Sequence, residues 1–166
     1  MMLQRLFRNS ASLAIGSLLV SFLLMTAGVA SAESEVKGIK GPIVITSDNL
    51  TADNAAHTAL FERSVVARTK EMTVHADKML VYSDKDSGDV TRIDASGNVQ
   101  LIKGNRIVTS RDATYFANED KVVFTGEPKA VEDGNVITGK KMTYLIHEDR
   151  FFVEGSKVFL TKKQTP

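Results

Sequence analysis

The residues best suited to metal binding are spread along the chain without a common spacing. The chain has three histidines, His57, His75 and His147, and no cysteine. Zinc sites usually place two ligands within a few residues of each other, and no two of these histidines are that close. We therefore expect the histidines to be exposed or tolerated side chains, and we predict no metal and no cofactor.

The stretch Ser83 to Asp89 begins like a calcium-binding loop, with Asp84, Asp86 and Gly88 at alternate positions. The twelfth position of such a loop supplies a bidentate carboxylate, and here it is Ala95. The stretch is therefore better interpreted as a solvated hairpin tip.

Nucleophilic and phosphate-binding motifs are also missing from the sequence. The serines do not occur in a G-x-S-x-G context, and no glycine-rich loop could hold a phosphate. Without a nucleophile, a base and an anion-binding loop placed together, the sequence predicts a protein that is not an enzyme.

Residues 1 to 32 have the pattern of a secretion signal. Arg5 and Arg8 precede an uncharged apolar run from Ala11 to Ala30, and Ala30-Ser31-Ala32 has the small residues that a signal peptidase recognises. We expect cleavage after Ala32, with residues 33–166 forming a single domain. A retained membrane anchor is the alternative, because the run is nearly long enough to span a bilayer.

Removal of this leader takes away Arg5 and Arg8 and changes the formal net charge from +1 to −1. A charge near zero without a basic stripe argues against a nucleic-acid partner. Export to an oxidising compartment is compatible with the sequence, but no disulfide can stabilise the fold.

A hairpin sequence recurs four times in the exported part. Its first arm starts at residues 44, 73, 107 and 136, a period of 29 residues with one five-residue insertion in the turn at Ser83 to Asp89. The second arm is marked by Gly97, Gly126 and Gly155, with Arg63 at the equivalent place in the first unit. Both arms are rich in β-branched and aromatic residues, and no helical periodicity is present. The domain is predicted to be all β.

The apolar positions change parity in the middle of each arm. Ile45 and Leu50 are five residues apart, and the shift occurs beside a column of small residues, Ser47, Ala76, Ser110 and Gly139. A strand that keeps one face buried through such a shift needs a bulge or a bend. Each arm should thus be two short strands, which gives about sixteen short antiparallel strands in two facing sheets, a jelly-roll-like or solenoid arrangement.

The predicted inner face of these sheets is apolar, and it could be either a closed core or a groove for a ligand. The first and last strands have no partner within the chain, so both ends are expected to be open to a partner strand. The inner residues are predicted to be Ile45, Leu50, Phe61, Val65, Val74, Met79, Val81, Ile93, Val99, Leu101, Val108, Tyr115, Phe124, Ile137, Met142, Tyr144, Phe151 and Phe159.

The repeated segments ITSDNL, VHADKMLVY, VTSRDATY and ITGKKMTY, together with ASGNV and FTGEP, resemble the OstA-like family of periplasmic lipopolysaccharide-export proteins, the LptA type. The resemblance implies an open twisted β-jelly roll of four tandem hairpin repeats. It also implies that lipopolysaccharide binds with its lipid A acyl chains in the apolar groove, and that the inner residues above line this groove.

The same resemblance implies partners of matching fold. These are an LptC-like inner-membrane domain and an LptD-like outer-membrane domain, both joined by edge-strand addition, and further copies of the chain joined end to end. The cations Lys78, Arg111, Lys140 and Lys141 lie near the bends and are interpreted as a solvated rim that could also meet lipid phosphates. Two alternatives stay open: a membrane-anchored LptC-like relay and a β-solenoid carbohydrate-binding module.

Overall fold

A computed structural model of the chain describes residues 41–161. The expected leader (1–32) and the cleavage position after Ala32 lie outside the described residues. Within 41–161 no helix has the length and apolar character needed to cross a membrane.

The described part consists of strands, one short 3₁₀ helix and the turns that connect them. The elements in chain order are β1 (Val44–Thr46), β2 (Asn49–Asp53), β3 (Thr58–Arg68), β4 (Thr73–Ser83), β5 (Val90–Lys103), β6 (Arg106–Phe116), η1 (Ala117–Glu119), β7 (Lys121–Thr125), β8 (Lys129–Glu132), β9 (Asn135–Thr138), β10 (Lys141–Leu145), β11 (Arg150–Glu154) and β12 (Lys157–Phe159).

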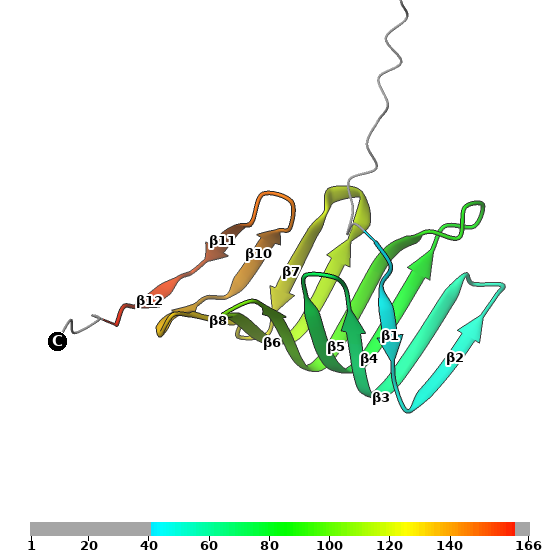
Figure 1. Ribbon diagram of the computed structural model, residues 1–166, viewed down its shortest axis with the longest axis horizontal. Helices are drawn as coiled ribbons and strands as arrows, with labels where there is room; N and C mark the ends of the chain where they lie inside the picture. Colours follow the sequence, from blue (N-terminus) through cyan, green and yellow to red (C-terminus); the bar gives the residue numbers. More distant parts are fainter. Residues whose placement is uncertain (1–40, 162–166) are drawn as a thin grey trace, which may run out of the picture. The chain divides into compact units, whose positions relative to one another are not determined.

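All strand pairs are antiparallel, and they divide into two half-sheets that share four long strands (Figure 1). Half-sheet A runs from β2 through the adjoining halves of β3, β4, β5 and β6 to β7, β10 and β11. Half-sheet B runs from β1 through the other halves of the same strands to β8, β9 and β12. The predicted open, all-β jelly-roll architecture is confirmed.

The structure describes twelve strands, whereas the sequence predicted about sixteen. The difference arises because β3, β4, β5 and β6 continue through their bends without losing strand geometry. The other four arms are interrupted there and form the pairs β1/β2, β7/β8, β9/β10 and β11/β12. Every arm is therefore bent as predicted, but only half of the arms are broken by the bend.

In the second arms the bends lie at the predicted glycine column, and each places a residue in the left-handed region. Gly97, Gly126 and Gly155 have φ of 76°, 75° and 64°, and Arg63 in the equivalent place has φ of 64°. Arg63 therefore adopts the conformation that glycine provides elsewhere, a conformation that costs an L side chain about 1–2 kcal/mol. Arg63 thus replaces the glycine of the other units without changing the backbone conformation of the bend.

Two of these glycines also allow a close approach of the facing arm. A Cβ atom at Gly97 would lie 2.4 Å from Asp77 Oδ2, and one at Gly126 would lie 2.6 Å from Arg111 Cβ. Arg111 N donates a hydrogen bond to Gly126 O at 3.0 Å, so the two arms are held together at this point. Glycine is needed there for space as well as for backbone conformation.

We predict that Gly126→Ala destabilises the fold by at least about 1 kcal/mol more than Gly88→Ala, as measured by urea unfolding. Both glycines have φ of 75°, but nothing lies within 4 Å of a Cβ at Gly88. The control therefore carries the same backbone strain without the clash. Equal losses in the two variants would show that the close approach at the bend is unimportant.

Candidate functional site

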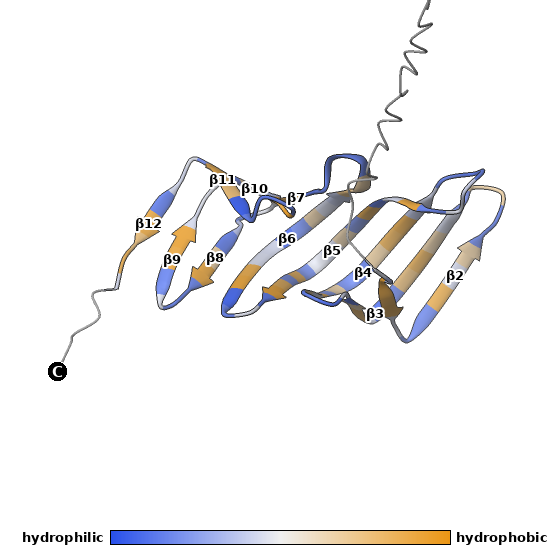
Figure 2. Cartoon of the chain, turned by 45° about the horizontal axis from the view of Figure 1, so that its top comes forward, coloured by the Kyte–Doolittle hydropathy of each residue, from blue (hydrophilic) through white to orange (hydrophobic). Residues whose placement is uncertain are grey.

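Bands of hydrophobic residues alternate with polar ones along the strands (Figure 2). The register shows that apolar residues form continuous rows across each half-sheet. Residues that are directly opposite each other in an antiparallel pair share a face, so the register identifies each row. The rows in half-sheet A are Leu50, Phe61, Met79, Ala95, Ala113, Phe124, Met142 and Val153, and Ala52, Ala59, Val81, Ile93, Tyr115, Val122, Tyr144 and Phe151. The row in half-sheet B is Ile45, Ala67, Val74, Leu101, Val108, Ala130, Ile137 and Val158.

Sixteen of the eighteen predicted inner residues are buried or half-buried in this interior. The buried ones are Val65, Met79, Val81, Ile93, Val99, Leu101, Val108, Tyr115, Phe124, Met142 and Tyr144. The half-buried ones are Ile45, Phe61, Val74, Ile137 and Phe151. Several smaller or turn-borne members of the same core are not among the predicted inner residues: Ala67, Met72, Ala76, Ala95, Ala113 and Val122.

Two of the predicted inner residues are exposed, for different reasons. Leu50 faces inward opposite Phe61, but its side chain is 59% exposed because β2 is an edge strand. The prediction for Phe159 was wrong. Phe159 is opposite Val136 on the outer face, and Val158 takes the inner position opposite Ile137. The run Val158-Phe159-Leu160 is apolar throughout, so its alternation could not reveal which residue faces inward.

The space between the half-sheets differs strongly along the fold. In the middle, a cavity of about 60 Å³ is lined by residues such as Met79, Leu101 and Phe124. A second cavity of about 470 Å³ lies between β9 and β12 on one side and β10 and β11 on the other, with Ile137, Phe151, Val153 and Val158 in its wall. The first holds about two waters at the volume of the liquid, whereas the second is in the range of ligand pockets. The interior is thus a packed core in the middle and a ligand-sized cavity at its C-terminal end.

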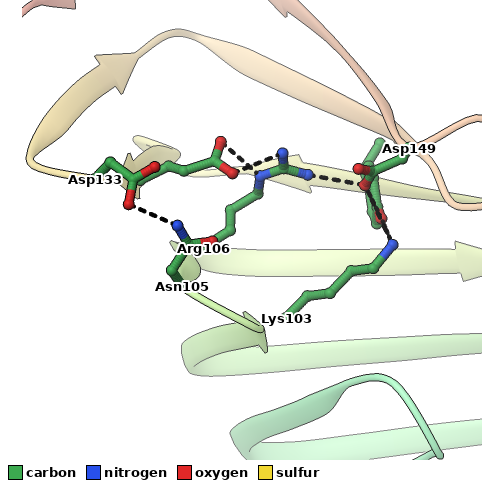
Figure 3. Close-up of polar contacts among 7 residues, drawn as sticks. Lys103, Asn105, Arg106, Asp133 and Asp149 are labelled. Carbon is green, nitrogen blue, oxygen red and sulfur yellow. Dashed lines mark hydrogen bonds and ion pairs between the residues drawn. The ribbon is translucent and has the colours of Figure 1, made fainter.

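A cluster of polar side chains connects the two half-sheets beside this larger cavity (Figure 3). We call it the ionic clasp and define it as Lys103, Arg106, Glu132, Tyr144 and Asp149. Lys103 ends β5, Arg106 begins β6 and Glu132 ends β8, all in half-sheet B. Tyr144 on β10 and Asp149 before β11 belong to half-sheet A.

The clasp converges on one carboxylate oxygen. Asp149 Oδ1 accepts hydrogen bonds from Arg106 Nη1 at 2.9 Å, Lys103 Nζ at 3.2 Å and the Tyr144 hydroxyl at 2.7 Å. On its other edge, the Arg106 guanidinium donates to both Glu132 oxygens, at 3.0 and 3.1 Å. The Arg106 and Lys103 side chains are only 18% and 23% exposed. The two cations are therefore largely shielded from solvent and neutralised by carboxylates, and Arg106 also lines the cavity.

The hydrogen bond from the Tyr144 hydroxyl, followed by those from Lys103 and Arg106, lowers the pKa of Asp149 to about 2. Burial raises the pKa of Tyr144. Burial acts to lower the pKa of Lys103, but its hydrogen bonds to Tyr144 and Asp149 outweigh this effect and raise it. At neutral pH the clasp therefore contains an ionised carboxylate held between two cations and a neutral phenol.

Three of the four cations predicted near the bends form ion pairs with solvent-exposed carboxylates, and the fourth, Lys140, is exposed. Lys78 pairs with Glu62 at 3.4 Å, Arg111 with Asp112 at 2.9 Å, and Lys141 with Glu154. Lys78 and Lys141 precede the inward-facing Met79 and Met142, so they are on the outer faces. The cations that are largely shielded from solvent are instead Lys103 and Arg106, and neither was predicted from the sequence.

The other candidate sites are not assembled in the described part of the chain. Within residues 41–161, no group of three or more His, Asp or Glu side chains could hold a metal ion. Asp84 Oδ1 accepts hydrogen bonds from the backbone of Asp86 and Ser87, both at 2.9 Å. This carboxylate therefore shapes its own turn.

The edges of both half-sheets carry the exposed apolar surface. Of the seven large hydrophobic side chains that are exposed within residues 41–161, six lie on or next to an edge strand. They are Val44, Leu50, Phe152, Val158, Phe159 and Leu160. Edge strands with exposed apolar side chains and unpaired backbone groups are suited to pairing with another chain.

We predict that the clasp makes stability depend on pH between about 4 and 2. The folded-state pKa of Asp149 is depressed, so its contribution is present above the unfolded value near 3.8 and is lost as the pH falls toward 2. Asp149→Asn should lower the thermal midpoint at pH 6, and its difference from the unmodified chain should shrink below pH 4. Glu154→Gln, which breaks an ion pair on the outer face, is the control. A difference for Asp149→Asn that is constant from pH 6 to pH 2 would contradict this role.

Comparison with known proteins connects this geometry to a family. The family model described as LptA/(LptD N-terminal domain) LPS transport protein matches residues 44–150. No individual curated protein matches the sequence. The fold is similar to the crystal structure of LptH, the LptA-homologous periplasmic component of the lipopolysaccharide transport device of Pseudomonas aeruginosa, with a TM-score of 0.68 and 14% identity over 76% of this chain and 99% of that chain. These matches give no support to a carbohydrate-binding module or to an anchored relay. The chain belongs to the LptA/LptD N-terminal-domain family of lipopolysaccharide transport proteins.

Proposed function

We propose that this chain is an LptA-type periplasmic carrier: it is exported, released by cleavage after Ala32, and holds the acyl chains of lipopolysaccharide between its half-sheets while domains of the same fold extend the path at both edges. The observation that carries the proposal is the continuous apolar inner face, which ends in a cavity of about 470 Å³ beside β11 and β12.

The energetic need for such a carrier follows from the hydrophobic effect. Exposing one acyl chain of about a dozen carbons to water costs on the order of 10 kcal/mol, at about 0.8 kcal/mol per methylene. An apolar trough that shields the chain during transfer removes most of this cost. Transfer of the lipid breaks no covalent bond, so the trough needs no catalytic group.

The C-terminal cavity is the best candidate for the point of entry. It is walled by Phe151 and Val153 from half-sheet A and by Ile137 and Val158 from half-sheet B. The arms around it are interrupted at their bends, so the two half-sheets are joined there by only a few residues per arm. Deeper insertion requires the half-sheets to separate, because the middle cavity of about 60 Å³ cannot hold an acyl chain. Met79 in the wall of the middle cavity and Met142 in the wall of the C-terminal cavity have flexible side chains that adapt to a sliding chain.

The edge strands support the proposed partners. An LptC-like domain at one end, an LptD-like domain at the other, or another copy of this chain would extend both half-sheets by strand addition. Leu50 and Val158 are the end members of their inner rows and are 59% and 51% exposed. A partner strand would cover them and continue the apolar face from one domain into the next.

We predict that a photo-crosslinking residue in place of Phe151 traps lipopolysaccharide, whereas the same residue in place of Phe152 does not. Phe151 lines the C-terminal cavity, and Phe152 is an exposed aromatic on the opposite face of the same strand. The pair is matched in residue type and in position, and crosslinked lipid is detected by immunoblotting. Phe61 and Phe124 should also trap lipid, and Lys85 at the long hairpin tip should not. Equal trapping at Phe151 and Phe152 would refute binding in the interior.

We predict concentration-dependent end-to-end association that Phe159→Pro weakens. Proline removes a backbone donor and disfavours strand addition at β12. Lys85→Pro, in an exposed turn away from the edges, should leave association unchanged. Sedimentation velocity over a range of concentrations measures both. A chain that stays monomeric throughout, or a Phe159→Pro variant that associates normally, would argue against pairing through this edge.

A further inference from the structure

We propose that Lys103 and Arg106 form a binding site for a phosphate group of the transported lipid, and that Asp149 occupies this site when no lipid is bound. The inference rests on the proposed function and adds a polar recognition element to the apolar trough. It also implies that lipid entry and release of the ionic clasp are linked.

The geometry is that of an oxyanion site. Three donors from three different segments converge on the single oxygen Asp149 Oδ1, at distances of 2.7 to 3.2 Å. A phosphate oxygen accepts hydrogen bonds of the same kind, and charge-assisted bonds from arginine and lysine are the usual means of binding one. The carboxylate therefore indicates which chemical group the site accepts.

The cations are positioned before any ligand arrives. Lys103 and Arg106 are directly opposite each other in the β5–β6 pair, so the backbone register fixes their separation. Glu132 holds the guanidinium through Nε and Nη2 and leaves Nη1 directed at Asp149. The guanidinium also lies over the Phe151 ring, 5.1 Å from its centroid. Replacing Asp149 by another anion requires no rearrangement of Arg106.

The Asp149 side chain, in contrast, is free to move away from Lys103 and Arg106 toward solvent. It lies in the turn between β10 and β11, its side chain is 54% exposed, and its φ of 48° is in the left-handed region. Its main polar partners are on the opposite half-sheet, apart from Tyr144. A competing dianion could displace the carboxylate toward solvent, and the clasp that joins the two half-sheets would then be broken.

The site is adjacent to the place where acyl chains would be bound. Arg106 and Asp149 both line the C-terminal cavity, together with the apolar Ile137, Phe151 and Val158. A ligand with a phosphate next to acyl chains satisfies both parts of this surface at once. A phosphate without acyl chains would gain only the polar contacts and would have to compete with Asp149.

The test compares binding of lipid A, enzymatically dephosphorylated lipid A and inorganic phosphate to the exported chain, by competition with a fluorescent lipid probe. Arg106→Gln should weaken binding of lipid A about tenfold and leave the dephosphorylated form within about twofold. Asp149→Asn should strengthen binding of lipid A only, because it removes the internal competitor. Inorganic phosphate at the same concentration should not displace the probe.

The matched controls are Lys141→Gln and Glu154→Gln, which remove the two members of an ion pair on the outer face and should change neither affinity. If Arg106→Gln does not fold, as judged by its thermal unfolding, Lys103→Gln gives the same test while leaving the Arg106–Glu132 pair in place.

A chain that binds neither lipid overturns the proposed function. A chain that binds both lipids, with equal effects of Arg106→Gln on the two, overturns the phosphate site alone. Saturable binding of inorganic phosphate would assign the site to free phosphate and overturn the lipid assignment.

Discussion

The fold depends on one constraint: each arm must reverse the alternation of its side chains halfway along, so that both of its halves bury their apolar residues on the same side. A straight strand cannot do this, because successive side chains point to opposite faces. Ile45 and Leu50 are separated by an odd number of positions and would face opposite ways without the bend. In each second arm a left-handed residue lies at the reversal, and in each first arm the reversal lies beside a small residue. The rows of apolar residues in the two half-sheets follow from these reversals.

The same constraint explains why the interior is both a core and a candidate lipid site. In the middle, four continuous arms hold the half-sheets close together, and side chains such as Val65, Val99 and Phe124 are almost completely buried. Toward the C-terminal end the arms are interrupted, the half-sheets are joined by short connections, and the cavity of about 470 Å³ lies between them. Stability comes mainly from the first region, and the capacity to accept a ligand comes from the second.

Much of this architecture can be predicted from the sequence because the repeat marks the bends directly. The glycine column fixes the bend in three units, and even Arg63 keeps the left-handed conformation. The register of β12 could not be predicted, since Val158, Phe159 and Leu160 are all apolar and show no alternation. The number of separate strands could not be predicted either, because nothing in the sequence distinguishes a bend that interrupts a strand from one that does not.

The ionic clasp escaped prediction because its members are far apart in the sequence and look individually like solvated turn residues. Lys103 and Asp149 are 46 positions apart, and Arg106 and Asp149 are 43 apart. A signal was nevertheless present: Lys103 and Arg106 continue the inner-face alternation from Leu101 and Val108. Charged residues at inward positions beside a turn should be examined as potential sites in other members of this fold.

Binding of lipopolysaccharide to the inner face between the half-sheets can be measured by purifying the chain from the periplasm of lipopolysaccharide-producing cells without detergent and quantifying the lipid that remains after extensive washing. We expect lipopolysaccharide in stoichiometric amount, with its acyl chains protected from added lipase. A washed protein that is folded but free of lipid, and that takes up none from an excess of lipopolysaccharide, would contradict binding at this face.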